Sequence, residues 1–345
     1  MSKTAGPAIP DGTSPLTKKD FETDQEVRWC PGCGDYAILS AVQQVFPTLG
    51  IPRENFVMVS GIGCSSRFPY YMNTYGFHTI HGRAPAVATG IKVANPKLSV
   101  WVVTGDGDAL SIGGNHLIHA MRKNVGVKIL MFNNRIYGLT KGQYSPTSEL
   151  GKRTKSTPFG SVDSPLNPLS LALGAECGFV ARSVDVYKQH LQDVLRAAAE
   201  HEGTAFVEIF QNCNIFNDKA FENFTERSIR EEMNIELVDG EPIRFGKDMS
   251  KGLRWSGTAF ETVTAGNGDE DLVAHDASAE NPTLAFALSR LSPPGFPMPI
   301  GVFRNVDRPS LEANIWGQLD AVRRERGEGD LHALLHAGDT WEVAG

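Results

Sequence analysis

The chain has 345 residues and lacks both long apolar runs and an excess of positive charge. No apolar stretch approaches the roughly 20 residues that a membrane-spanning helix needs, and residues 1–20 lack the apolar region of a signal peptide. The net charge of -7 argues against a surface for nucleic acid or anionic lipid. We therefore expect a cytoplasmic protein whose partners include neither a membrane nor a nucleic acid.

Cysteine is scarce as well: the five cysteines are Cys30, Cys33, Cys64, Cys177 and Cys213. A cytosolic chain keeps its thiols reduced, so a CxxC pair with two further cysteines suggests a metal site rather than a disulfide framework. Spacing alone fits zinc and an iron–sulfur cluster equally well. A thioredoxin-like dithiol is the other alternative, but the charged segment 18–28 before Cys30 does not resemble the strand that such a site needs.

Two apolar runs that end in polar pairs are the most informative feature. Residues 98–104 are short and β-branched and lead into Gly105-Asp106-Gly107, and residues 127–132 lead into Asn133-Asn134. Residues 108–123 between them have helical spacing, with Gly126 as a stop. Because a right-handed crossover brings the carboxyl ends of two parallel strands together, this pattern predicts a doubly wound α/β sheet with both polar pairs at one edge.

Ligands bind at that edge of an open α/β sheet. Asp106 and Asn134 would present two oxygens there, which suits magnesium in the company of a phosphorylated ligand and water. Gly105 and Gly107 would let backbone amides approach the phosphates. A nicotinamide fingerprint is the rival interpretation, but it needs glycine at the sixth position after the strand, where this chain has Leu110.

These motifs carry a family resemblance over about residues 28–220. Gly105-Asp106-Gly107 followed by Asn133-Asn134 resembles the thiamine diphosphate signature. The segments Trp29–Gly34 (WCPGCG) and Asn133–Gln143 (NNRIYGLTKGQ) resemble the β subunit of 2-oxoacid:ferredoxin oxidoreductases, and most of all the 2-oxoglutarate type. The resemblance implies a doubly wound parallel sheet of the thiamine diphosphate-binding fold with a C-terminal extension.

The resemblance also implies a set of ligand-binding residues. Magnesium would be held by Asp106, Asn134 and the backbone carbonyl of Ile136. One [4Fe-4S] cluster would be held by Cys30, Cys33, Cys64 and Cys213, which leaves Cys177 as an ordinary buried thiol. Contacts with thiamine diphosphate would come from Ile62, Gly63, Cys64, Ser65, His81, Gly107, Asp108, Gly138 and Leu139. Without the signature, Gly138 could equally be a turn residue and Leu139 core filling.

The implied reaction decarboxylates a 2-oxoacid, most of all 2-oxoglutarate, with coenzyme A to give an acyl-CoA (succinyl-CoA), carbon dioxide and reduced ferredoxin. A cluster beside thiamine can accept the electrons, whereas zinc cannot. Arg67 follows Cys64 by three positions, so we expect it to face the reaction site and bind the second carboxylate of 2-oxoglutarate. Its alternative partners are a structural acid or a diphosphate oxygen. We expect His81 to donate to thiamine or to the keto oxygen.

The chain lacks two parts that such an enzyme needs. No candidate is found for the glutamate that activates the aminopyrimidine, nor a second Cys-rich motif for carrying electrons outward. The family supplies the glutamate and much of the coenzyme A site from an α subunit, so we expect an α2β2 assembly and an inactive isolated chain. The alternatives are pyruvate as the main substrate, a non-redox thiamine decarboxylase or carboligase with structural zinc, and a regulatory protein, against which Asp106 and Asn134 argue.

The predicted organisation is a flexible arm at 1–20, the thiamine diphosphate domain with its cluster at 21–220, and an extension at 221–345 that packs on the core or on a partner. His116-x-x-His119 has one-face helical spacing but no third ligand nearby, so packing is the simpler role. Within the extension we expect a charged helix at 221–233, a hairpin of 235–238 with 242–245, a loop at 266–268, a helix at 283–291, an extended segment at 293–299 and an amphipathic helix at 311–326.

Overall fold

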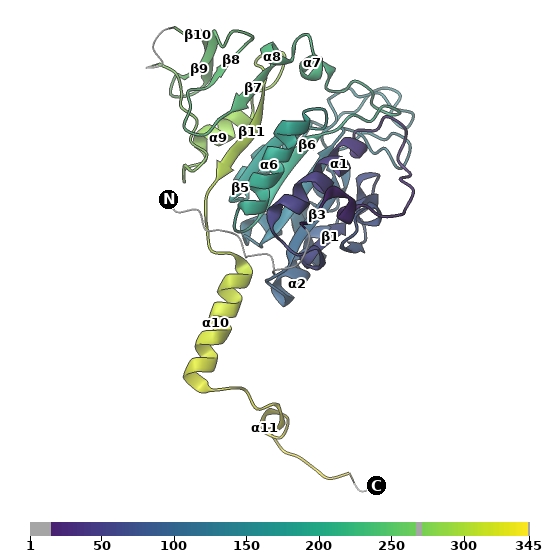
Figure 1. Ribbon diagram of the computed structural model, residues 1–345, viewed down its shortest axis with the longest axis vertical. Helices are drawn as coiled ribbons and strands as arrows, with labels where there is room; N and C mark the ends of the chain where they lie inside the picture. Colours follow the sequence, from purple (N-terminus) through teal and green to yellow (C-terminus); the bar gives the residue numbers. More distant parts are fainter. Residues whose placement is uncertain (1–14, 267–270, 344–345) are drawn as a thin grey trace.

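The computed structural model describes residues 15–266 and 271–343, which form a central, mostly parallel sheet covered by helices on both faces (Figure 1). The strand order is β2-β1-β3-β4-β6-β5-β11-β7, and only the β11–β5 pair is antiparallel. The strands are β1 (Phe56–Ser60), β2 (Tyr75–His78), β3 (Ser99–Gly105), β4 (Val127–Asn133), β5 (Phe179–Val184), β6 (Ala205–Phe210), β7 (Asn234–Leu237) and β11 (Met298–Asn305). This architecture confirms the predicted doubly wound α/β class.

Two helical layers bury the two faces of the sheet. One layer holds α1 (Asp35–Val45) and α6 (Lys188–Glu200); the other holds α2 (Ala84–Ala94), α4 (Gly114–Arg122), α5 (Pro168–Gly174) and α9 (Thr283–Ser289). Along β1, Phe56 and Met58 pack with the first layer, and Val57 and Val59 pack with the second. Neighbouring strand residues point to opposite faces, so a strand that is apolar throughout requires cover on both sides.

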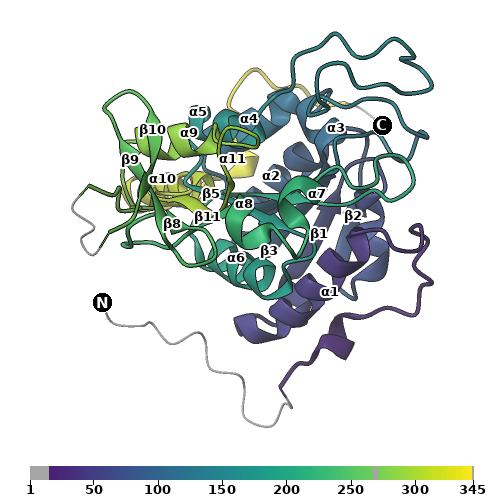
Figure 2. The same ribbon diagram turned by 90° about the horizontal axis from the view of Figure 1, so that it is seen from above.

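The register brings the ends of the central strands to one edge. Gly105 of β3 pairs with Phe132 of β4, and Asn133 of β4 pairs with Phe210 of β6. The motifs after β3 and β4 therefore meet, as the strand-end argument predicted. The connection between β4 and α5, residues 134–167, contains no regular helix or strand and extends to the border of the molecule (Figure 2).

The helix expected at 108–123 is broken. The structure has α3 (Asp106–Leu110) and then α4, with a turn at 111–113 between them. A Cβ on Gly82 would lie 2.5 Å from the backbone nitrogen of Gly113, and one on Gly113 would lie 2.4 Å from the carbonyl oxygen of Asp108. The two glycines therefore let the 79–83 loop and this turn touch backbone to backbone, a contact that periodicity could not indicate.

The prediction of a flexible arm at 1–20 needs a further correction. Residues 1–14 of the expected arm lie outside the described residues, but Lys18–Phe21 forms a 3-10 turn and Phe21 is fully buried. Along α1, Ile38 and Leu39 are buried, whereas Tyr36 and Ala37 are exposed. Further 3-10 turns are η2 (Phe46–Leu49), η3 (Arg53–Asn55) and η4 (Ser65–Tyr71).

The C-terminal third differs most from expectation. The segment 221–233 forms two short helices, α7 (Glu222–Thr225) and α8 (Arg230–Met233), rather than one. The predicted hairpin is wrong, because β7 joins the large sheet beside β11, while β8 (Arg244–Phe245) joins a small antiparallel sheet with β9 (Lys251–Trp255) and β10 (Phe260–Thr264). The last two strands were not predicted. The loop expected at 266–268 lies partly outside the described residues.

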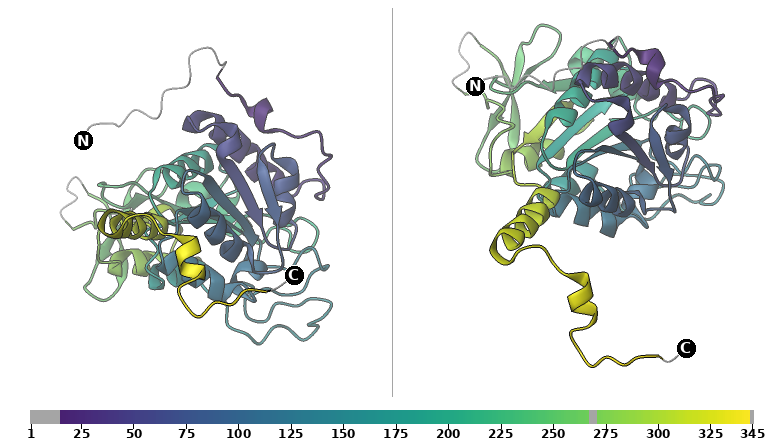
Figure 3. Two further views of the ribbon diagram at one scale, coloured as in Figure 1. Left: turned by 90° about the horizontal axis from the view of Figure 1, so that it is seen from below. Right: turned by 60° about the horizontal axis from the view of Figure 1, so that its bottom comes forward.

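The two expected helices of this region form: α9 ends at Ser289, two residues before the predicted end, and α10 (Leu311–Arg326) has its predicted bounds but buries only Glu312, so it lacks the buried apolar face of an amphipathic helix. The segment expected to be extended at 293–299 runs into β11, which begins at Met298. Only the start of α10 packs on the body, through the Trp316 indole, which donates to the carbonyl of Val93 at 2.9 Å. The rest of α10, then α11 (Leu331–Leu335), points away from the body (Figures 1 and 3). Among the described residues, no helix is both long and apolar enough to cross a bilayer.

Candidate functional site

A cavity opens at the carboxyl edge of β1, β3, β4 and β6. Every residue expected to contact thiamine diphosphate or magnesium lies on its wall: Ile62, Gly63, Cys64, Ser65, His81, Asp106, Gly107, Asp108, Asn134, Ile136, Gly138 and Leu139. The same wall holds Gly105, which was expected to let a backbone amide approach phosphate, and five residues that were not predicted: Asp35, Phe132, Tyr137, Thr140 and Gln211. Leu139 is 53% exposed, so the alternative that it fills the core is wrong.

Asp106 begins α3 at the floor of this cavity. Its carboxylate is buried, and Oδ2 accepts hydrogen bonds of 2.5 Å from both the Ser145 and the Thr147 hydroxyls. Burial raises the pKa of Asp106 to about 6, although these hydrogen bonds oppose the rise. A buried carboxylate that is only partly compensated is suited to a cation, which would favour its charged form.

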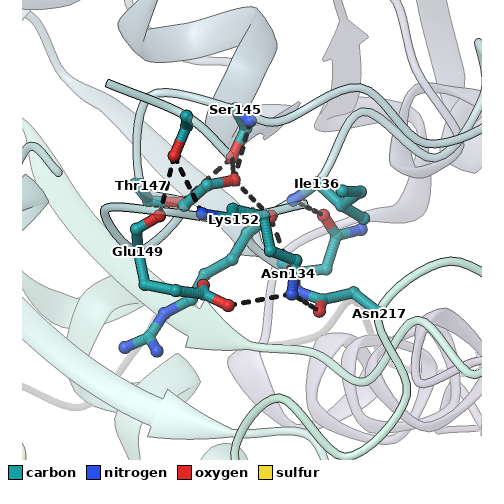
Figure 4. Close-up of polar contacts among 10 residues, drawn as sticks. Asn134, Ile136, Ser145, Thr147, Glu149, Lys152 and Asn217 are labelled. Carbon is teal, nitrogen blue, oxygen red and sulfur yellow. Dashed lines mark hydrogen bonds and ion pairs between the residues drawn. The ribbon is translucent and has the colours of Figure 1, made fainter. Parts of the chain in front are cut away.

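Asn134 lies across the cavity in a tight turn. Its Oδ1 accepts from the backbone N–H of Ile136 at 3.1 Å, and the intervening Arg135 has a φ of 56°. Its Nδ2 donates to Gln211 Oε1 at 2.9 Å, so the amide is fixed with its oxygen away from Gln211. The Asn134 backbone carbonyl accepts from the Asn217 side chain at 2.9 Å (Figure 4). These contacts hold the Asn134 turn in one conformation.

Gly107 explains the close packing at the next position. A Cβ there would lie 2.2 Å from the Tyr137 ring, and the Tyr137 hydroxyl donates to the Gly107 carbonyl at 3.0 Å. Glycine is therefore required for the Asn133–Gln143 segment to cover the first turn of α3. Sequence analysis assigned Gly107 to phosphate approach and missed its contact with Tyr137.

Asp108 is used within the chain. Oδ1 accepts from the backbone N–H groups of Ile62 (3.1 Å) and Gly82 (2.8 Å) and from His81 Nδ1, and Oδ2 accepts from Thr104 at 2.7 Å. Its carboxylate is thus an organiser of two loops rather than a free ligand. With Nδ1–H bonded to Asp108, His81 presents Nε2 as an acceptor when neutral and as a donor only when protonated.

The four predicted cluster cysteines converge beside the cavity. A Cβ placed on Gly138 would lie 3.6 Å from Cys64 Sγ and 3.7 Å from Cys213 Sγ. Burial raises the pKa of Cys64 to about 12, with further contributions from Asp35, Cys213 and Cys30. Burial also raises the pKa of Cys33, with contributions from Asp35, Cys213 and Cys64. Each thiol therefore lies within the electrostatic reach of others, and anionic sulfur here requires positive charge.

Among the described residues, no group of three or more His, Cys, Asp or Glu side chains is placed to hold a metal ion, and this includes the pair His116 and His119. Cys177 lies apart, fully buried, and donates to the carbonyls of Phe179 and Thr204, which confirms its interpretation as an ordinary buried thiol.

Asp35 and Gln211 connect the cysteines to the cavity and were missed from sequence. Asp35 is buried without a hydrogen-bond partner for Oδ1, and burial raises its pKa to about 7. Gln211 Nε2 lies 3.2 Å from Cys33 Sγ, while its Oε1 binds Asn134. Gln211 directly follows β6, so the strand-end rule applied to a third strand could have identified it. Asp35 had no comparable indication.

Arg67 is the one predicted catalytic residue outside the cavity wall in the described structure. Its Nε donates to the Tyr71 hydroxyl at 2.9 Å, and the guanidinium lies 5.3 Å from the centroid of the Tyr70 ring. Arg67 is the third residue of η4, and its side chain turns toward Tyr70 and Tyr71 of the same helix. Among the described residues, no acidic side chain pairs with Arg67, so the alternative of a structural acid does not hold.

Comparison with known proteins agrees with this geometry. Residues 61–209 match the model of the thiamine pyrophosphate enzyme C-terminal TPP-binding domain. The chain is 55% identical over 99% of its length, and 92% of the relative's, to the 2-oxoglutarate oxidoreductase subunit KorB of Mycobacterium tuberculosis. It is 46% identical to subunit beta of a 2-oxoacid:ferredoxin oxidoreductase of Aeropyrum pernix, over 57% of this chain and 62% of that one.

A solved structure covers the extension as well. The 2-oxoglutarate:ferredoxin oxidoreductase of Magnetococcus marinus, with 2-oxoglutarate, coenzyme A and succinyl-CoA bound, aligns with 96% of this chain and 98% of its own at 34% identity and a TM-score of 0.76. The cavity and the four cysteines therefore lie in a fold that this chain shares with 2-oxoglutarate oxidoreductases. The chain belongs to the family of 2-oxoglutarate:ferredoxin oxidoreductase β subunits.

Proposed function

We propose that this chain, together with an α subunit, converts 2-oxoglutarate and coenzyme A into succinyl-CoA and carbon dioxide and passes two electrons to ferredoxin. One carbon–carbon bond breaks to release carbon dioxide, the S–H bond of coenzyme A is replaced by a carbon–sulfur bond with release of one proton, and the electron pair leaves in two single steps. The observation that carries the proposal is the shared wall: Cys64 lines the cavity, and Gly138 lies against the sulfurs of both Cys64 and Cys213. A cofactor in the cavity and a cluster on the thiols would then be neighbours.

The cavity residues fit magnesium and thiamine diphosphate. Asp106 would supply one carboxylate oxygen, Asn134 its amide oxygen and Ile136 its backbone carbonyl, a set of oxygens that magnesium accepts. Bound thiamine diphosphate supplies an electron sink for decarboxylation. The chain itself keeps the cavity in shape: Asp108 holds the loops at 61–62 and 81–82 together, and Tyr137 covers Gly107.

The four thiols fit a [4Fe-4S] cluster better than zinc. A cubane is wider than a single ion, so its ligands lie farther apart than those of tetrahedral zinc. The pKa values of Cys33 and Cys64 are raised in part by the other cysteines, which supports a shared site for the four thiols, and a cluster there could accept electrons whereas zinc could not. Cys30 is exposed and Cys33 only partly so, which leaves one side of the group near solvent for electron exit to ferredoxin.

An α subunit is proposed because the site is incomplete and its surroundings are apolar. Large side chains stand exposed beside the cavity and on the 134–167 connection: Ile80, Ile112, Leu139, Leu150, Phe159 and Val162. Exposed apolar groups that gather in one region mark a protein interface. We propose that the α subunit covers this region, supplies the missing glutamate and part of the coenzyme A site, and forms an α2β2 assembly.

The experiment is an anaerobic assay of the co-expressed α and β chains with coenzyme A and ferredoxin. We expect rapid reduction of ferredoxin with 2-oxoglutarate, slower reduction with pyruvate, and none from the β chain alone. Iron analysis of the same preparation should give about four iron atoms for each β chain. Faster turnover with pyruvate would overturn the substrate, and zinc without iron would overturn the redox reaction.

A further inference from the structure

We infer that the hydroxyl groups of Ser145 and Thr147 make the metal site selective for magnesium over calcium, because they confine the Asp106 carboxylate to one metal-binding oxygen. This inference rests on the magnesium site of the proposed function. Both hydroxyls donate to the same atom, Asp106 Oδ2, at 2.5 Å. No side chain in the described ranges donates to Oδ1, which leaves that atom for a cation.

The arrangement is buried and charge-assisted. Asp106, Ser145 and Thr147 are at most 5% exposed, so water does not compete for these hydrogen bonds. Hydrogen bonds to a carboxylate are shorter and stronger than those between neutral groups. The Thr147 oxygen also lies 2.9 Å from Asn133 Oδ1, but its single proton goes to the nearer, charged acceptor.

The two hydroxyls are held in position by their own loop rather than by Asp106. The Ser145 backbone N–H donates to Ser148 Oγ at 2.8 Å, and Ser148 Oγ donates to the carbonyl of Arg135 at 2.6 Å. Farther along, Lys152 Nζ bonds to Glu149 and to Asn217, whose amide holds the Asn134 carbonyl (Figure 4). The loop is therefore fastened to the same turn that carries Asn134.

This fastening decides how Asp106 can bind a cation. Magnesium prefers six oxygens in a close octahedron and takes single oxygens from carboxylates. Calcium takes six to eight oxygens at longer distances and often takes both oxygens of one carboxylate. When two fixed hydroxyls occupy Oδ2, two-oxygen binding would break two charge-assisted hydrogen bonds. The site therefore favours the ion that needs only Oδ1.

The test uses the assembled α and β chains, stripped of metal with EDTA and saturated with thiamine diphosphate. Titration with Mg²⁺ or Ca²⁺, followed calorimetrically, gives the two dissociation constants and their ratio. In Ser145→Ala/Thr147→Val we expect Mg²⁺ to bind about 10- to 100-fold more weakly, as for other groups that orient metal ligands. We expect the dissociation constant for Ca²⁺ to stay nearly unchanged, so that the preference for Mg²⁺ falls by about the same factor.

Matched variants separate the hydroxyls from packing and from the metal site itself. Thr147→Ser keeps the hydroxyl and should keep the wild-type ratio, whereas Thr147→Val alone keeps the shape and should lower it. A wild-type ratio in Thr147→Val and in the double variant would overturn the inference, provided that Asp106→Asn abolishes Mg²⁺ binding. Undiminished Mg²⁺ binding by Asp106→Asn would instead overturn the proposed metal site. If the double variant does not assemble, the ratios of Thr147→Val and Ser145→Ala decide the matter.

Discussion

Both edges of the central sheet bury polar groups, but the hydrogen-bond partners of these groups differ between the two edges. At the carboxyl edge the buried groups are acids, thiols and amides that surround a cavity, and Asp35 keeps an unpartnered oxygen. At the amino edge Lys128 donates to the carbonyls of His201 and Gly203, and Lys92 donates to those of Pro96 and Leu98. Lys128 is buried and Lys92 partly buried, and each gives two of its three N–H groups to loop carbonyls, so the loop backbone uses most of their bonding capacity.

The amino edge also explains how the C-terminal extension is attached. Glu312 is the one buried residue of α10, and it accepts from the backbone N–H of Gly126 at 3.1 Å. The Ser310 hydroxyl caps the helix by accepting from the Ala313 N–H at 3.3 Å. The comparison teaches that burial of a charged group does not by itself indicate function. A buried oxygen on a cavity wall that no described residue hydrogen-bonds, such as Asp35 Oδ1, is the stronger indication.

The largest expected effect is at the cysteines, where Cys213 and Cys177 form a matched pair. Cys213→Ser removes a proposed ligand and should abolish ferredoxin reduction and the cluster's visible absorption. Cys177→Ser changes a buried thiol that bonds only to backbone and should retain both. Iron content and anaerobic absorption spectra check the pair. Equal iron in the two variants would mean that Cys213 is no ligand, and the carboxyl edge would then lose its distinguishing property.

Substitution of Arg67 tests whether the substrate site at the carboxyl edge extends beyond the residues that line the cavity. Removal of a charged partner of a substrate carboxylate costs about 2 kcal/mol or more, so Arg67→Leu should raise KM for 2-oxoglutarate about thirtyfold while KM for pyruvate changes little. Arg67→Lys, which keeps the charge, should recover part of the loss. Steady-state kinetics with both acids provide the readout. The same loss for both acids would assign Arg67 to the packing of Tyr70 and Tyr71 instead.

At the amino edge, Lys128 should make the free energy of unfolding depend on pH. Burial lowers the pKa of Lys128 to about 7, against about 10.4 in the unfolded chain. Between these values the unfolded chain binds the extra proton, so the free energy of unfolding should rise with pH by up to about 1.4 kcal/mol per unit. Below about pH 7 both states are protonated and the dependence should vanish.

Urea unfolding from pH 6 to pH 9.5 measures this slope in wild type and in Lys128→Met. The difference between the two proteins isolates the one lysine, because other groups titrate in both. We expect the variant to lack the rise above pH 7. Parallel curves for the two proteins would show that Lys128 is protonated in the folded chain, and the contrast between the edges would need another basis.

The smallest effect is expected beyond the anchored start of α10. Residues 317–343 are exposed throughout, so a chain that stops after Gly327 should unfold within about 0.5 kcal/mol of the full chain. Trp316→Ala, which removes the contact with Val93, should destabilise more than this truncation does. Denaturant midpoints of both proteins give the ranking. The reverse ranking would mean that the terminal segment packs on the body.

Strand-end reasoning placed Asp106, Gly107 and Asn134 correctly because it depends on local pattern and one topological rule. These residues after β3 and β4 were assigned to one edge and line the cavity, whereas the family resemblance supplied the other predicted cofactor and magnesium residues that line it. The same reasoning could not decide which strands of the C-terminal extension pair with each other. The segments 235–238 and 242–245 look like a hairpin, yet β7 gains a parallel neighbour in β11, sixty residues later in the chain. Local turn residues carry no information about such a distant strand.

The amino-acid sequence by itself determined the two central strands β3 and β4, the order of the motifs and the residue types that follow these strands at the carboxyl edge, because periodicity and turn residues act over a few positions. Only the tertiary structure decided that Ser145 and Thr147 hold Asp106, that Gln211 joins Asn134 to Cys33, and that Arg67 turns to Tyr71. Those contacts join loops with no repeating pattern, and their geometry depends on how the whole sheet and both helical layers pack.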